Sequence, residues 1–68
     1  MEKKIALTLD RALEERGMTR YELAKRTGTH FQTIDNYYKS KVTRYDSDIL
    51  LRICVALNCD IGDIIKII

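Results

Sequence analysis

The chain has 68 residues, of which 46% are hydrophobic and 32% are charged, and it contains no proline. This length leaves room for one small domain, and this composition is unlike that of a disordered chain. No apolar run is long enough to span a membrane and no secretory signal pattern opens the chain, so we expect a cytoplasmic protein with no membrane partner.

The formal net charge is +2, but the basic residues are concentrated in the middle of the chain. Between Arg16 and Arg44 there are seven basic and two acidic residues, so this segment carries +5 and the remainder carries −3. A positive segment in a chain whose remainder is negative predicts one surface that binds a polyanion. A solvated charged face is the alternative, and charge alone does not separate the two.

Cysteine and histidine offer little for metal or redox chemistry. Cys54 and Cys59 have four residues between them, whereas a zinc or redox site has two, and the chain holds one histidine. We therefore expect two buried or half-buried thiols in the reduced form, no metal and no cofactor. The sequence also has no glycine-rich phosphate loop and no spacing typical of a catalytic triad, which argues against an enzyme.

The first predicted elements are a short strand and a helix. Apolar residues alternate in KIALTL, which favours an extended segment near residues 3–7. Thr8 is then placed to cap a helix of good helix formers that runs to about Arg16. Gly17 ends this helix, because glycine accepts the left-handed conformation that follows many helices.

Two more helices are predicted on either side of a single glycine. Thr19 and Glu22 have the spacing of a capping box, and the helix they open ends near Thr27. Gly28 lies in the turn between the two helices. Thr29 then opens a third helix with a second capping box, closed by Gln32, and this helix runs to about residue 39.

The last third of the chain predicts two further helices and an apolar tail. Asp46 or Ser47 caps a fourth helix with the sequence SDILLRICVAL, which ends at Asn58. Asp60 caps a short fifth helix, IGDII. The final IIKII is typical of a strand. Residues 3–7 would pair with it, either within one chain or between two chains.

The two helices around Gly28 meet the demands of a helix-turn-helix unit over residues 20–39. A small residue is needed where the helices touch, and apolar residues must hold the pair to the body; Ala24, Leu23, Ile34 and Tyr37 supply these. Through MTRYELAKRTG, THFQTIDNYYKSK and DSDILLRICVALNCDIGDII, nearly the whole chain resembles the phage Cro and CI repressor-type helix-turn-helix family. The resemblance implies a mainly α-helical, five-helix, lambda-repressor-like domain over residues 1–68, with a minimal two-stranded β element from the termini.

Three residues depart from the usual pattern of that family. Thr27 and Thr29 stand where apolar residues are common, and Ser40 stands where glycine often follows the third helix. Each substitution changes local packing without removing the motif.

The family resemblance implies a sequence-specific regulator of transcription, a repressor, that places a recognition helix over about residues 30–39 in the major groove of double-stranded DNA. Gln32 and Asn36 share one helix face, and both side chains form bidentate hydrogen bonds with adenine. The full set of predicted base-reading residues is His30, Phe31, Gln32, Thr33 and Asn36. The predicted phosphate contacts are Arg20, Thr29, Tyr38, Lys39, Lys41 and Arg44.

Several of these side chains have a second interpretation. Gln32 could only close its capping box, and Asn36 could be a polar surface residue with no contact to DNA. Phe31 could pack back onto the second helix, and His30 could face a phosphate or solvent. Asp35, which is unfavourable beside DNA, could pair with Lys39 one turn later or accept from a cytosine amine.

The fourth helix carries a second apolar stripe, Leu51 and Val55, on the side away from its main stripe. One small core does not cover both sides, so either the IIKII tail folds over the second stripe or a second copy covers it. We expect a homodimer on a near-palindromic operator. The predicted interface residues are Leu51, Val55, Ile65, Ile67 and Ile68. An antitoxin-like or accessory protein, which uses this apolar half to hold another protein, is the alternative.

Overall fold

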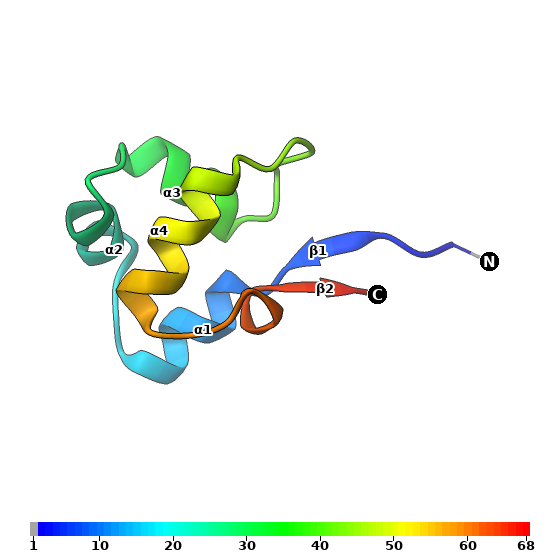
Figure 1. The fold of residues 1–68 in the computed structure, drawn as a ribbon, viewed down its shortest axis with the longest axis horizontal. Coiled ribbons are helices and arrows are strands. Elements are labelled where there is room, and N and C mark those ends of the chain that lie inside the picture. Colours follow the sequence, from blue (N-terminus) through cyan, green and yellow to red (C-terminus); the bar gives the residue numbers. More distant parts are fainter. Residues whose placement is uncertain (1) are drawn as a thin grey trace.

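The computed structural model describes residues 2–68, which form four α-helices, one turn of 3-10 helix and two short strands (Figure 1). In chain order, the elements are β1 (Ile5–Leu7), α1 (Leu9–Arg16), α2 (Arg20–Thr27), α3 (Phe31–Tyr38), α4 (Ser47–Leu57), η1 (Ile61–Asp63) and β2 (Ile65–Ile67).

All four α-helices end in the same way. The residue after each helix, or one further on, has a positive φ, and the next amide donates to a helix carbonyl five residues earlier over 3.0 Å. This is the Schellman ending, which satisfies carbonyls that the helix leaves unpaired. The positive-φ residues are Gly17 (60°), Gly28 (66°), Ser40 (56°) and Asn58 (54°). The predicted stops at Gly17, Gly28 and Asn58 are therefore confirmed.

The predicted helix starts are confirmed at α2 and α4 but wrong at α3. Thr19 and Glu22 form the complete capping box, and Asp46 accepts from the amides of residues 48 and 49. The cap of α3 is His30, whose side chain makes no capping hydrogen bond. The hydroxyl of Thr29 instead donates to the carbonyl of Thr27, and the amide of Thr29 completes the Schellman ending of α2.

The prediction of a fifth helix is wrong. Asp60 and Asp63 do form a capping box, but they enclose only the three residues of η1. The next residue, Ile64, is fully buried, and the chain continues from it directly into β2. Burying Ile64 therefore takes the chain out of the helical conformation after one turn.

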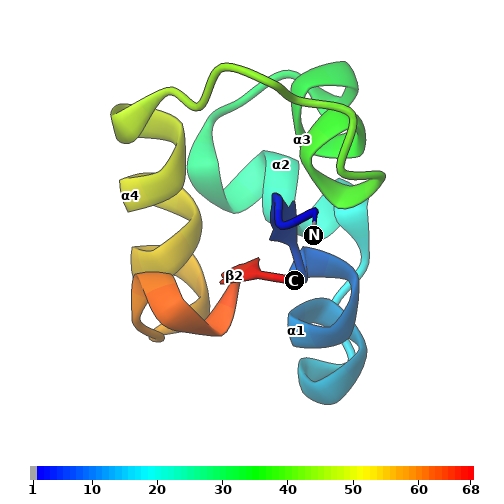
Figure 2. The ribbon, with the colours of Figure 1, turned by 90° about the vertical axis from the view of Figure 1, so that its right-hand side faces the viewer.

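The two strands form an antiparallel ribbon within the chain, at the side of the molecule where both termini lie (Figures 1 and 2). Ile5 faces Ile67 and Leu7 faces Ile65 across the ribbon. Leu7 is buried, whereas Ile5 and Ile67 are exposed. The apolar face of the ribbon thus begins in the core and continues into solvent.

One core joins the helices and the end of the chain. Figure 2 shows α4 on one side of the molecule and α1 and α3 on the other, with α2 between them. The side chains that fill the space between these helices are fully buried: Leu9, Leu13, Leu23, Ile34, Ile53 and Ile64. A hydrogen bond also links the ends of α1 and α4, because Arg16 donates to the carbonyl of Leu57 over 3.0 Å.

Candidate nucleic-acid interface

Helices α2 and α3 pack closely around the turn at residues 28–30. Leu23 and Ile34 are fully buried, and Ala24 leaves space for the neighbouring backbone. Gly28 adopts the left-handed conformation that the turn requires. Thr27, unusual at its position, is also buried, and its hydroxyl donates to the carbonyl of Leu23 over 2.8 Å, so its polar atom is satisfied within α2.

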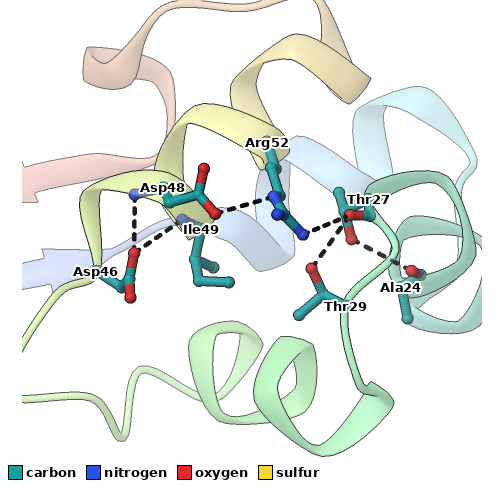
Figure 3. Close-up of polar contacts among 7 residues, drawn as sticks. All are labelled: Ala24, Thr27, Thr29, Asp46, Asp48, Ile49 and Arg52. Atoms are coloured by element: carbon teal, nitrogen blue, oxygen red, sulfur yellow. Dashed lines mark hydrogen bonds and ion pairs between the residues drawn. The ribbon is translucent and has the colours of Figure 1, made fainter.

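Helix α4 contacts the turn between α2 and α3 through the side chain of Arg52 (Figure 3). Arg52 donates from Nη1 to the carbonyl of Thr27 over 3.3 Å, and its Nε lies 3.0 Å from the carboxylate of Asp48 one turn earlier. Thr29 donates to the same Thr27 carbonyl over 3.4 Å. The Thr27 carbonyl therefore connects α2, the turn and α4 by hydrogen bonds. These contacts hold the turn from which α3 begins.

The solvent-facing side of α3 carries a pair of amides. Gln32 donates from Nε2 to Oδ1 of Asn36 over 3.1 Å, and Gln32 is exposed. Gln32 does not close a capping box, so that alternative is wrong. Each amide keeps donors and acceptors that the mutual hydrogen bond does not use, and together they present an ordered polar edge. His30 is exposed at the start of the helix, and Thr33 is half-buried beside it.

Phe31 packs back onto α2. Its ring stacks on that of Tyr21, with the ring centroids 4.2 Å apart and the planes 16° from parallel. Aromatic pairs of this kind contribute about 0.5–1.5 kcal/mol beyond the area they bury. The packing interpretation of Phe31 is therefore confirmed, while its contact with a base stays a prediction.

Asp35 is the one acidic residue of α3, and it is buried with 7% of its surface exposed. Its carboxylate pairs with Arg20 at the start of α2 and with Lys39, whose Nζ lies 3.0 Å away. The hydrogen bond from Lys39, followed by the one from Arg20, holds the pKa of Asp35 below its usual value although burial acts in the opposite direction. The predicted pairing with Lys39 is confirmed.

The pairing with Arg20 is a feature that the sequence did not reveal. Fifteen residues separate Arg20 from Asp35, and no periodicity links them. The guanidinium of Arg20 also lies 4.5 Å from the ring centroid of Tyr38 and 5.9 Å from that of Phe31. A carboxylate and two aromatic rings thus fix Arg20 between α2 and α3.

The remaining predicted phosphate contacts fall into two groups. Tyr38 and Thr29 are half-buried and occupied by the contacts described above. Lys41 and Arg44 are exposed in the segment between α3 and α4, and within residues 2–68 neither forms an ion pair. This segment is held at its end, because the amide of Asp46 donates to the hydroxyl of Tyr37 over 3.0 Å.

A family model for the Cro/C1-type helix-turn-helix DNA-binding domain matches residues 8–68. The chain belongs to this family. The match spans the helix-turn-helix of α2 and α3 and the whole of α4, so the elements described above are those of a DNA-binding domain.

Two solved structures share this fold. The transcriptional regulator VanUg is 30% identical in sequence, with a TM-score of 0.78 over 100% of this chain and 89% of that one. A candidate DNA-binding protein from Bacteroides fragilis is 24% identical, with a TM-score of 0.81 over 93% of this chain and 100% of that one, and it supports the fold alone. A comparison with curated proteins finds no significant match.

No helix in residues 2–68 combines the length and the apolar character needed to cross a membrane. In the same part of the chain, no three His, Cys, Asp or Glu side chains are grouped so that they could hold a metal ion.

Proposed function

We propose that residues 1–68 act as one domain that recognises a specific sequence in double-stranded DNA and represses transcription in the cytoplasm. Helix α3 enters the major groove with its N-terminal end at the bases. The residues proposed to read bases are His30, Phe31, Gln32, Thr33 and Asn36. Membership of a DNA-binding helix-turn-helix family supports this proposal, as does the polar character of the exposed side of α3.

The hydrogen-bonded pair Gln32–Asn36 is the observation that carries the proposal. Amide side chains contribute little to a core, yet here two of them are aligned on the outer face of a short helix. Their free groups match the acceptor N7 and the donor N6 of adenine. Each good bidentate contact contributes about 1–3 kcal/mol of discrimination against the wrong base.

The phosphate contacts follow from the charges around that face. Lys41 and Arg44 are exposed beyond the end of α3 and reach the backbone directly in this arrangement. Arg20 keeps guanidinium N–H groups that Asp35 does not use, so it positions α3 and also meets a phosphate. Thr29, Tyr38 and Lys39 complete the proposed set. The affinity falls as salt rises, and each lost contact makes the slope of log affinity against log salt shallower by about 0.9.

We further propose that two copies bind a near-palindromic operator. Leu51 and Val55 are 61% and 70% exposed on the outer face of α4, and Ile67 and Ile68 are exposed at the end of the ribbon. Leu51 and Val55 lie one turn apart on α4, and large apolar side chains exposed next to one another are typical of an association surface. A two-fold dimer would place two α3 helices about one helical turn of DNA apart.

The proposal is tested with Gln32→Ala and Asn36→Ala in a fluorescence binding assay, on a sequence first selected from random DNA. Each variant should lose about 1–3 kcal/mol of preference for the selected sequence and keep its non-specific binding. The control is Glu14→Ala, which removes an exposed side chain on α1. If the two α3 variants keep the full preference, the bases are read by another surface.

The antitoxin-like or accessory function has one observation in its favour. The exposed apolar side chains of α4 border a groove of about 580 Å³, which a segment of another protein could fill. The two functions are distinguished by the effect of Leu51→Asp. In a DNA-binding dimer this change lowers operator affinity, whereas in a protein-binding module it leaves DNA binding as it was and removes the partner.

A further inference from the structure

The two cysteines of the chain are brought together by the end of α4. Cys54 lies in the last turn of the helix, and Cys59 follows the left-handed residue Asn58. The amide of Cys59 donates to the carbonyl of Cys54 over 3.0 Å. In a Schellman ending, these are the two positions whose side chains contact each other. At the corresponding positions of α1 the chain has Leu13 and Met18, an apolar pair.

Both thiols are reduced and partly open to solvent. Each is half-buried, and each lines the groove beside α4. Burial, and then the adjacent Cys59, raise the pKa of Cys54 to about 11. The Cys54 thiol is therefore protonated at neutral pH and lies next to its partner. Disulfide exchange requires one of the two thiols to lose its proton, since a thiolate is the attacking species.

We propose that Cys54 and Cys59 form a reversible intramolecular disulfide, a modification site for small disulfide oxidants such as oxidised glutathione. The thiolate of Cys59 attacks one sulfur of the oxidant and releases one glutathione thiolate. Cys54 then loses its proton and attacks the Cys59 sulfur of the mixed disulfide, which releases the second glutathione. The protein loses two hydrogen atoms, and one disulfide of the oxidant is reduced to two thiols.

Geometry favours closure within one chain. A disulfide needs the two Cα atoms about 4.4–6.8 Å apart, and a backbone hydrogen bond between the two residues holds the main chains close. The hydrogen bonds of Asn58 and Cys59 already order this turn, so closing the ring restricts few further dihedral angles. Since both thiols belong to one chain, closing the disulfide needs no second copy.

The full chain is equilibrated with mixtures of reduced and oxidised glutathione, quenched with acid and measured by mass spectrometry. The expected product has the mass of one chain less two hydrogen atoms, and on a non-reducing gel it migrates as a single chain. A product dominated by glutathione adducts or by linked dimers overturns the proposal, because either would show that the two sulfurs do not reach each other.

A matched variant keeps two thiols in the same groove but moves one of them by a helical turn. Leu50, like Cys54, is half-buried on α4 and lines the groove, so the control combines Leu50→Cys with Cys54→Ser. The equilibrium constant for disulfide formation in the natural chain should exceed that of the control by at least about tenfold, a reduction potential lower by about 30 mV. Equal constants would contradict a pre-arranged pair. Circular dichroism of both proteins establishes that each is folded.

Discussion

At the scale of single residues, the buried carboxylate of Asp35 is the least expected feature of the proposed DNA-binding surface. It lies on α3, the proposed recognition helix, where a negative charge would repel phosphate, yet it pairs with Arg20 and Lys39. The group formed by Asp35, Arg20 and Lys39 has a net charge of +1. Asp35 therefore serves to position two cations, and the sequence revealed only the partner that lies one turn away on the same helix.

Asp35→Asn should change DNA binding in two opposite ways. Removing the negative charge strengthens non-specific binding at low salt and steepens the salt slope by about one unit, because a cation becomes available to phosphate. Loss of the ion pair releases Arg20, so the ratio of specific to non-specific affinity falls. Both quantities are obtained from affinities measured over a series of salt concentrations.

The control for that variant is Glu14→Gln, which removes the same charge from an exposed carboxylate on α1. It should leave both the salt slope and the specificity ratio near their original values. If the two variants behave alike, the effect comes from net charge and not from the position of Arg20.

The stability of the fold should depend on the ionisation of Asp35. Its pKa is lowered in the folded chain, so the folded state binds this proton less readily than the unfolded state does. The stabilisation is present above the ordinary pKa near 3.8 and is lost as the pH falls through the lowered value. Denaturant unfolding from about pH 5 to about pH 2 should therefore show a steeper loss in the natural chain than in Asp35→Asn.

Ser40 combines a strained backbone with a useful side chain. Its φ of 56° costs about 1–2 kcal/mol for a residue with a Cβ, while its Oγ accepts the amide hydrogen of Leu7 over 3.1 Å. That hydrogen bond contributes about 0.5–1.5 kcal/mol. Ser40→Gly should therefore leave the free energy of unfolding within about 1 kcal/mol, because the two effects offset each other.

Ser40→Ala removes the hydrogen bond and keeps the strain. Chemical unfolding should show a loss of about 1 kcal/mol relative to the natural chain. A stability equal to that of the natural chain would mean that the contact between Ser40 and β1 contributes nothing.

At the scale of elements, the sequence predicted where helices end better than where they begin. Gly17, Gly28 and Asn58 accept positive φ for reasons that belong to single residues, so their roles could be predicted. The start of α3 was predicted too early: Thr29 has a side chain that could cap a helix, but its hydroxyl contacts the carbonyl of Thr27 and the helix begins at Phe31. The length of η1 depends on the burial of Ile64, which no local pattern contains.

Gly28→Ala tests the turn between α2 and α3. No atom lies within 4 Å of the added Cβ, so the cost is backbone strain at φ +66°, about 1–2 kcal/mol of unfolding free energy. Gly62→Ala is the control, since it also meets open space and has no positive φ, and it should change stability by less than about 0.5 kcal/mol. Thermal unfolding of the two variants side by side measures the difference.

At the scale of the whole molecule, the strand pairing shows the limit of sequence patterns. The alternation in residues 3–7 predicted a strand, but it left open whether the partner is the same chain. The ribbon pairs Ile5 with Ile67 across nearly the full length of the chain, and this contact depends on how the helices bring the termini together. For the candidate site, the pattern predicted the amides of α3, while the packing of Phe31 and Arg20 needed the structure.

The proposed dimer is tested by Leu51→Asp. A charge on the exposed face of α4 should shift the monomer–dimer equilibrium at least tenfold towards monomer, about 1.4 kcal/mol, without loss of helical signal. Sedimentation of the natural chain and the variant over a range of concentrations gives both equilibrium constants. Ile67→Asp tests the ribbon in the same way, and a natural chain that stays monomeric at high concentration with and without DNA contradicts the dimer.

The most direct test of the account is selection of bound sequences from a random DNA pool by the natural chain and by Gln32→Ala and Asn36→Ala. We expect the natural chain to enrich two inverted half-sites about one helical turn apart, each with adenine at the positions that the amides read. We also expect the variants to lose preference at those positions alone. No enriched sequence, or the same sequence enriched by all three proteins, would contradict the claim that the outer face of α3 reads DNA.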